Sequence, residues 1–154
     1  MIAPRDLEIV EISAADTHAL RREVLRNGDA DANVVFEEDG SHGVVHLGAR
    51  LDGRLVGVSS WVPRAFPEAL DDDGPAVQLR GMATANGLRG TGIGGVLLEA
   101  GCNHRRANGV ALVWARARDA ALAFYGRHGF LVHGDGFIDA TTGLPHHVVH
   151  RRVG

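Results

Sequence analysis

The sequence contains no lysine, and all 16 of its Lys and Arg residues are arginine. Without a side-chain amine the chain cannot form a Schiff base with a carbonyl substrate or a pyridoxal cofactor. It also lacks the lysine that phosphate-loop NTPases and kinases place on the phosphates of their nucleotide. These enzyme classes are excluded.

Cysteine is nearly as scarce, since Cys102 stands alone. One cysteine excludes an internal disulfide and a cysteine-based zinc cluster, and it fits a reducing compartment. The first residues have no apolar stretch of signal-peptide form, and no apolar run approaches the ~20 residues of a membrane span. We therefore expect a cytoplasmic protein with no membrane contact and no metal site.

What is present is typical of one globular domain over residues 1–154, with 45% hydrophobic and 23% charged residues. A net charge of −3 argues against a general nucleic-acid binder. The apolar patterning predicts the element order β-α-ββ-β-α-β-α-ββ, which indicates an α/β fold with a mixed sheet flanked by helices.

Turn and cap signals place these elements along the chain. The Asp52-Gly53 dipeptide favours a type I′ turn, because both of its residues tolerate positive φ, and it predicts a hairpin. Strands are expected at residues 7–12, 44–51, 54–62, 76–84, 110–115, 130–133 and 147–153. Helices are expected at residues 16–27, 92–107 and 119–129, with surface loops at 28–43 and 63–75.

Four glycines lie at the junction of the strand predicted at 76–84 with the following helix, at positions 90, 92, 94 and 95. Glycines let a backbone turn tightly and bring its N–H groups close to a ligand. The start of a helix adds unsatisfied N–H groups and the positive end of the helix dipole. The segment therefore predicts a phosphate or pyrophosphate site.

The glycine spacing leaves two phosphate ligands to weigh. Gly90, Gly92 and Gly95 satisfy the G-x-G-x-x-G fingerprint of dinucleotide-binding oxidoreductases. That fingerprint expects an acidic residue about 20 positions on, but residues 110–116 contain no carboxylate. The chain is also short for two mononucleotide-binding halves, so this alternative is disfavoured.

The same segment matches Arg/Gln-x-x-Gly-x-Gly/Ala, and here the chain resembles the GNAT superfamily of acetyl-CoA-dependent acyltransferases. The resemblance covers residues 44–153 and rests on four segments in order, which are Gln78-Leu-Arg-Gly-Met-Ala-Thr84, Arg89-Gly-Thr-Gly-Ile-Gly94, Ala121-Leu-Ala-Phe-Tyr-Gly-Arg-His-Gly-Phe130 and Gly143-Leu-Pro-His146. It implies a single GNAT-type domain whose central strands splay apart, and acetyl-CoA as cosubstrate.

The resemblance also implies which residues bind the cofactor. The diphosphate would be held by Arg89, Gly90, Thr91, Gly92, Ile93, Gly94 and Gly95. The pantetheine arm would pair with the backbone of Met82, Ala83 and Thr84.

Direct attack of an amine on the thioester needs no enzyme nucleophile, and the chain has no Gly-x-Ser-x-Gly motif. Glycine inside a strand often marks a bulge, so Gly81 either turns the Met82 N–H toward the thioester carbonyl as an oxyanion donor or serves only close packing. Tyr125, the only tyrosine, occupies the family's general-acid position. A phenol can protonate a departing thiolate when it is held in contact.

Other roles are less defined by the sequence. Gln78 cannot act as a base, which leaves His146 as the best candidate. Arg118 stands where many family members carry an asparagine, and it either reaches a cofactor phosphate or is a surface residue. The acidic residues at 37–39 and 71–73 either attract a cationic acceptor or are solvated. The acceptor is expected to be a small-molecule or peptide amine, a homodimer is compatible with the family, and the alternative function is a CoA-binding module without turnover.

Overall fold

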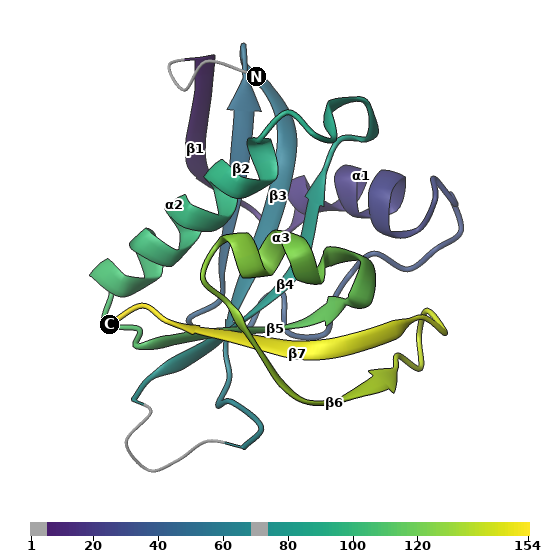
Figure 1. Ribbon diagram of the computed structural model, residues 1–154. Helices are drawn as coiled ribbons and strands as arrows, with labels where there is room; N and C mark the ends of the chain where they lie inside the picture. Colours follow the sequence, from purple (N-terminus) through teal and green to yellow (C-terminus); the bar gives the residue numbers. More distant parts are fainter. Residues whose placement is uncertain (1–5, 69–73) are drawn as a thin grey trace. The chain divides into compact units, whose positions relative to one another are not determined.

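The computed structural model describes residues 6–68 and 74–154 of the chain (Figure 1). Seven strands form one mixed sheet in the order β1-β2-β3-β4-β5-β7-β6. The predicted α/β fold, a mixed sheet flanked by helices, is confirmed. The chain divides into two compact units. The first unit consists of Met1–Val62 and Leu79–Gly101, and the second of Pro63–Gln78 and Cys102–Gly154.

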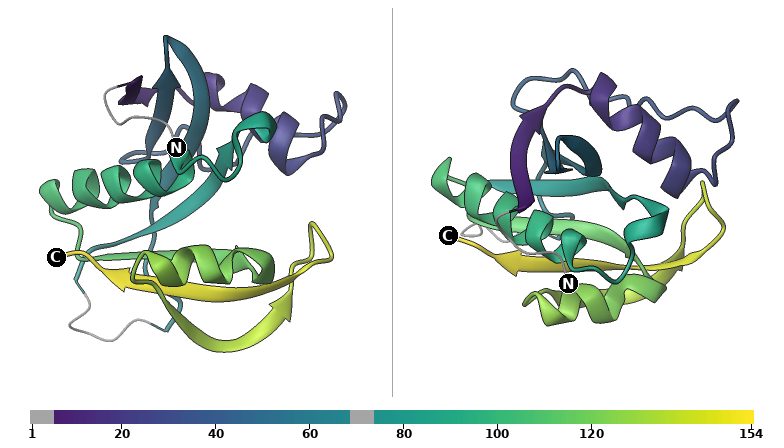
Figure 2. Two further views of the ribbon diagram at one scale, coloured as in Figure 1. Left: turned by 45° about the horizontal axis from the view of Figure 1, so that its top comes forward. Right: turned by 90° about the horizontal axis from the view of Figure 1, so that it is seen from above.

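Three antiparallel strands begin the first unit, and Figure 2 shows them side by side. They are β1 (Leu7–Ile12), β2 (Val45–Leu51) and β3 (Arg54–Pro63). Asp52 and Gly53 join β2 to β3 with φ values of +51° and +81°. Both values are positive, as a type I′ turn requires, so the predicted hairpin is confirmed.

A helical segment covers one face of these strands. It runs through η2 (Ala15–Thr17), α1 (His18–Leu20) and the π-helical η3 (Arg21–Leu25). Its start is capped because the Ser13 and Asp16 side chains each accept a hydrogen bond from the other's backbone N–H. Leu20 packs against Val58 and Ala83 in a buried cluster. The helix predicted at 16–27 is therefore present, with mixed helical geometry.

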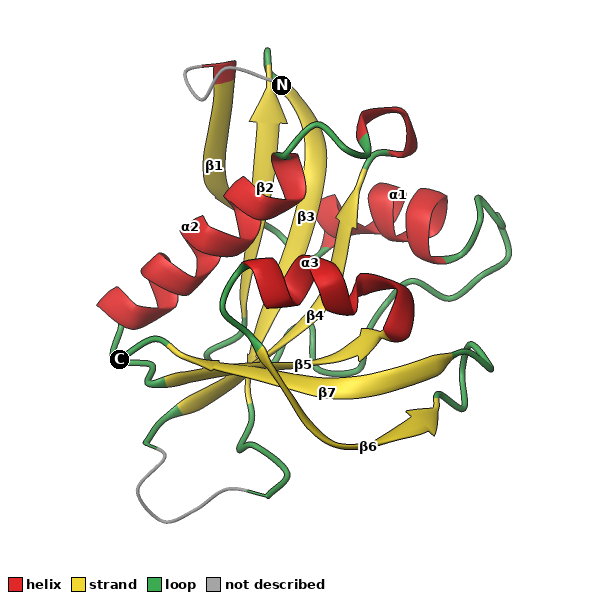
Figure 3. Ribbon diagram, in the orientation of Figure 1, coloured by secondary structure: helices red, strands yellow, loops and turns green. Residues whose placement is uncertain are grey.

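The other face of the first unit packs against α2 (Ile93–Ala107). Ile93 at the start of this helix is buried with Ala49 and Val56. β4 (Ala76–Thr84) leads into α2 through the short turn η4 (Asn86–Leu88). Figure 3 shows this strand–loop–helix connection. β4 has the predicted bounds, and α2 begins one residue after the predicted start and ends where predicted.

The second unit contains β5 (Leu112–Arg118), β6 (Leu131–Ile138) and β7 (Pro145–Arg152). β7 lies antiparallel between β5 and β6. β6 continues five residues past the end of the strand predicted at Phe130–His133, to Ile138, because β7 pairs with it on both sides of a register shift between His133 and Phe137. The glycines in between, Gly134 and Gly136, lie within that register shift, and pairing with β7 resumes at Phe137.

Two helical turns and an aromatic cluster complete the second unit. η5 (Asp119–Ala121) and α3 (Leu122–Arg127) follow β5, and Gly129 ends this helix with a φ of +78°. Phe66, Leu112 and Trp114 form the buried cluster. The parallel register of β4 with β5 covers residues 76–78 and 112–114. The separation of the strands beyond this point stays a prediction.

Candidate functional site

The loop between β4 and α2 exposes its backbone. Gly90 and Gly92 have φ values of +77° and +90°, which side-chain-bearing residues rarely adopt. A Cβ added at Gly87, Gly90 or Gly92 would meet no atom within 4 Å. The glycines are therefore not required by packing, and their main chain is accessible to a ligand.

Helix α2 adds N–H donors to this loop. Its first intrahelical bond runs from Val96 N to Gly92 O at 3.1 Å. The preceding N–H groups, at positions 93–95, lie in the first turn, where a helix offers them no carbonyl. The Ile93 side chain is 1% exposed and anchors the turn, so its contribution to a ligand would be its backbone N–H.

The structure brings the predicted diphosphate residues 89–95 together at one helix start. Arg89 is exposed, and its guanidinium lies 3.3 Å from Oδ1 of Asn86 in the same turn. Along β4, Met82 and Thr84 are half-buried, whereas Ala83 is buried in the cluster under α1. Ala83 therefore offers a ligand only its backbone. The arrangement can bind a diphosphate through main-chain donors.

Gly81 has a φ of +59° in the interior of β4. A positive φ at this position changes the direction of the next peptide N–H, as in a bulge. A Cβ built on Gly81 would lie 2.7 Å from Cε2 of Phe36 and 3.3 Å from Nε of Arg21. Unlike the glycines of the loop, Gly81 is required both by conformation and by packing.

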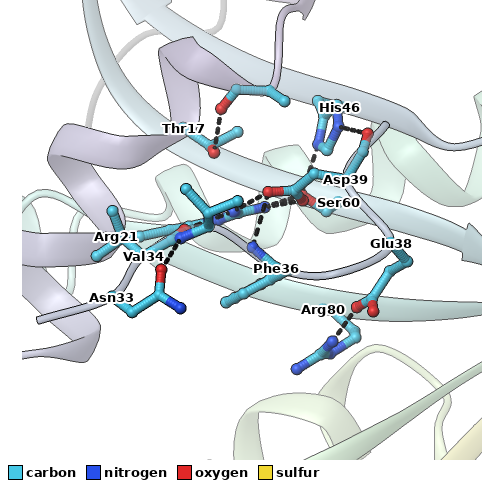
Figure 4. Close-up of polar contacts among 12 residues, drawn as sticks. Thr17, Arg21, Asn33, Val34, Phe36, Glu38, Asp39, His46, Ser60 and Arg80 are labelled. Atoms are coloured by element: carbon cyan, nitrogen blue, oxygen red, sulfur yellow. Dashed lines mark hydrogen bonds and ion pairs between the residues drawn. The ribbon is translucent and has the colours of Figure 1, made fainter. Parts of the chain in front are cut away.

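Figure 4 shows a buried polar network that the sequence did not predict. Its Arg21 side chain lies next to Gly81. Arg21 is 1% exposed and donates two hydrogen bonds to the carboxylate of Asp39, at 2.7 and 2.9 Å. It also donates to the Ser60 hydroxyl and to the Val34 carbonyl. His46 contacts Ser60 Oγ through Nδ1 at 2.7 Å and the Asp39 carbonyl through Nε2 at 3.1 Å.

The Phe36 ring lies against two guanidinium groups next to this network. The Cζ of Arg21 is 3.7 Å from the ring centroid and the Cζ of Arg80 is 4.4 Å from it. Arg80 also forms an ion pair with Glu38. Guanidiniums over an aromatic face are attracted by the ring quadrupole. Phe36 is thus held by both arginines.

Asp39 is ionised in this setting. Burial alone raises the pKa of its carboxyl group, but the hydrogen bonds from Arg21 and from the Phe36 N–H outweigh burial and lower it below the ordinary value. Of the acidic residues 37–39, Glu38 and Asp39 are therefore engaged by arginines rather than free to attract a cationic acceptor. Residues 71–73 lie outside the described part of the chain.

In the second unit, Tyr125 is buried on α3. Its ring centroid lies 5.3 Å from those of Phe124 and Phe130. Burial raises the pKa of Tyr125 to about 12, and Cys102 adds to the rise. The phenol is therefore neutral and retains its proton at neutral pH.

His146 lies at the start of β7 and is 6% exposed. Its Nδ1 is 2.9 Å from the Leu144 carbonyl, which can only accept a hydrogen bond. In the neutral ring Nδ1 then carries the proton and Nε2 the lone pair. Arg118 lies opposite His146 in the β5–β7 register, and the adjacent His147 contacts Asp119 at 2.6 Å.

Within residues 6–68 and 74–154, no three His, Cys, Asp or Glu side chains are grouped so that they could hold a metal ion. No helix in the described segments has the length and apolarity needed to cross a membrane.

Known proteins share this architecture. A family model described as "Acetyltransferase (GNAT) family" matches residues 8–130. The uncharacterized N-acetyltransferase YitI of Bacillus subtilis is 32% identical over 143 residues, covering 93% of each chain. An acyl-CoA N-acyltransferase from Pseudomonas aeruginosa has a TM-score of 0.74 at 22% identity, covering 94% of this chain and 99% of its own. An aminoglycoside 6'-N-acetyltransferase complexed with coenzyme A has a TM-score of 0.72 at 13% identity, with 96% and 97% covered.

Proposed function

The chain belongs to the GNAT family of acetyltransferases, and from this premise we propose that it transfers an acetyl group from acetyl-CoA to a primary amine. The observation that carries the proposal is the open glycine backbone at the start of α2, where Gly90 and Gly92 are exposed and no atom lies within 4 Å of their Cβ positions. The coenzyme A in the aminoglycoside acetyltransferase of similar fold agrees with this ligand.

The diphosphate of acetyl-CoA binds the backbone of residues 89–95. Its charge is balanced by the positive end of the 15-residue helix α2 and by Arg89. The pantetheine arm pairs with the backbone of Met82, Ala83 and Thr84. The Met82 N–H, redirected by the positive φ of Gly81, donates to the thioester oxygen as negative charge develops on it.

The reaction is a direct displacement. The amine nitrogen attacks the thioester carbon, the C–N bond forms, and the tetrahedral intermediate collapses by breaking the C–S bond. The attacking nitrogen loses one proton to His146, whose neutral ring has its lone pair on Nε2. The sulfur leaves as a thiolate and receives a proton from Tyr125.

The high pKa of Tyr125 sets the conditions for that last step. A general acid must hold its proton before it is used, and a pKa of about 12 ensures this at every practical assay pH. The thiol that forms has a pKa of ~8.5 in water, taking cysteine as its model. Transfer from Tyr125 becomes favourable only where the same apolar surroundings also raise the pKa of the thiol.

Calorimetry with CoA and NAD, each added to the full chain, tests the ligand. We expect heat from CoA and none from NAD, because the sequence after α2 lacks the acidic ribose ligand of dinucleotide sites. Binding of NAD without binding of CoA would overturn the proposal.

A screen of amines that measures release of free thiol from acetyl-CoA tests turnover. With any active acceptor, Tyr125→Phe should slow thiol release by ~10²–10⁴-fold, because the proton donor is lost while the ring remains. The matched control is Phe66→Leu, which alters a comparably buried aromatic residue of the second unit that is not in the proposed machinery. An unchanged rate in Tyr125→Phe would exclude the phenol as the acid. If CoA binds and no amine is acetylated, the alternative of a CoA-binding module is favoured.

A further inference from the structure

We propose that Phe36, together with the buried Arg21–Asp39 pair, is a positioning element that holds the peptide between Gly81 and Met82 in the orientation needed to polarise the thioester carbonyl. The proposal rests on the proposed function, since it takes the Met82 N–H as the oxyanion donor. It assigns a role to a loop that contains none of the residues proposed to touch the cofactor.

The Phe36 ring contacts Gly81. The Cβ position of Gly81 lies 2.7 Å from Cε2 and 3.2 Å from Cζ of Phe36, so the ring edge lies directly against the glycine backbone. Glycine populates positive and negative φ about equally. The backbone at Gly81 therefore has no conformational preference of its own for +59°, and its neighbours must select it.

Two arginines restrict the movement of the Phe36 ring. Arg21 and Arg80 both lie over it, and each arginine is paired with an acidic residue of the same loop, Asp39 and Glu38 respectively. The Phe36 N–H also donates to Oδ2 of Asp39 at 2.9 Å. The loop therefore forms ion pairs with both of the arginines that lie over its phenylalanine ring.

Hydrogen bonds of Ser60 and His46 connect this loop to the strands. Ser60 Oγ accepts a hydrogen bond from Arg21, so its own hydrogen can go to Nδ1 of His46. Nε2 of His46 then donates to the Asp39 carbonyl. Every polar hydrogen of Ser60 and His46 is used once, and β2 and β3 fix the loop that carries Phe36.

An unsatisfied hydrogen-bond donor of Arg21 lies beside Gly81. Arg21 Nε is buried and finds no acceptor among the described residues, and it lies 3.3 Å from the Cβ position of Gly81. A buried donor without a partner is costly, and such costs tend to persist at functional sites. Here the cost accompanies a guanidinium placed directly against the Gly81 backbone.

Isotope-edited infrared spectroscopy of bound [1-¹³C]acetyl-CoA tests the proposal without an acceptor amine. The wild-type protein should lower the carbonyl stretching frequency relative to free acetyl-CoA, because an N–H bond to the oxygen weakens the C=O bond. Phe36→Leu should lose this downshift while its Kd for CoA, measured by calorimetry, stays unchanged. With an active amine, kcat should fall by up to ~10²-fold, the scale set by small misplacements of a catalytic group, with KM for acetyl-CoA retained.

Ser59→Ala is the control, because Ser59 is a buried residue of β3 whose hydroxyl bonds to Leu47 and Trp61 rather than to the network around Phe36. It should keep the downshift. Arg80→Gln removes one of the two guanidinium groups that lie over Phe36, at a partly exposed site. It should therefore lose part of the frequency downshift, and it tests the proposal even where Phe36→Leu does not fold.

The outcomes separate the two proposals. A wild-type downshift that persists in both Phe36→Leu and Arg80→Gln overturns the positioning role and leaves the proposed function intact. A wild-type protein that binds acetyl-CoA without any downshift overturns the Met82 donor itself.

Discussion

Two loops of the first unit treat their polar groups in opposite ways. The loop at residues 33–39 directs two of its three carboxylates inward, where Asp39 and Glu38 pair with arginines and Asp39 is only 9% exposed. The loop at residues 89–92 leaves its glycine backbone open, with no atom near the Cβ positions of Gly90 and Gly92. A loop that satisfies its polar groups internally holds its own shape, whereas one that leaves donors at a helix start can bind a ligand.

Asp39→Asn should produce the largest effect and tests the inward loop. The substitution leaves the Arg21 guanidinium buried without a counter-charge, and breaking a buried pair in this way typically costs about 3–5 kcal/mol of unfolding free energy. Urea denaturation measures it. Glu37→Gln, two residues earlier and exposed, is the matched control and should stay within about 0.5 kcal/mol.

Equal, small losses in both variants would mean that the buried pair contributes no more than a surface charge. The inward carboxylates of the loop at 33–39 would then not be a source of stability, contrary to what their burial indicates.

Acid should remove part of the same stabilisation. Because the folded-state pKa of Asp39 is lowered, its contribution is fully present above the ordinary pKa of ~3.9 and is lost as pH falls through the lowered value. The difference in unfolding free energy between wild type and Asp39→Asn should therefore shrink below about pH 4. Urea titrations at several pH values measure it, and a difference that stays constant into strong acid would contradict the assigned ion pair.

The sequence predicted the open loop well because its signals are local. Strand, glycines and helix follow one another within residues 76–107, so β4 and α2 were located by patterning alone. The inward loop depends on pairs far apart in sequence, such as Arg21 with Asp39 and with Ser60. One signal was available: Arg21 precedes Val24 and Leu25 by three and four residues, which places its guanidinium on the apolar side of the helix.

The catalytic candidates show the same division. Tyr125 was located by its motif and lies on the predicted helix, but its burial and raised pKa follow from Phe124, Phe130 and Cys102 packed around it. Those contacts depend on how α3 is seated, which no spacing of residues specifies. Motifs therefore located the candidate groups, and packing set their chemistry.

Gly92→Ala should have an intermediate effect and tests the open loop. A methyl group has room there, but a φ of +90° is strained for alanine, at a cost of about 1–2 kcal/mol. If the backbone shifts to relieve this strain, the Kd for CoA should rise by about tenfold, as measured by calorimetry. Gly87→Ala is the matched control, because its Cβ position is equally open and its φ is not positive.

A Kd for CoA that changes equally in both glycine variants would show that the positive φ of Gly92 does not matter for the ligand. An unchanged Kd in both would place the diphosphate elsewhere.

Arg89→Gln should have the smallest effect, because the side chain is exposed and the backbone donors of the loop remain. One unit charge acting on a phosphate at about 4 Å in water contributes about 1 kcal/mol, so the Kd for CoA should rise about fivefold at low salt. The difference in Kd for CoA between wild type and variant should narrow toward 1 M salt, where the screening length falls to about 3 Å. Calorimetry at two salt concentrations measures both, with urea denaturation expected to be unchanged. A difference that is independent of salt would mean that Arg89 acts through the Asn86 contact on the shape of the turn rather than through its charge.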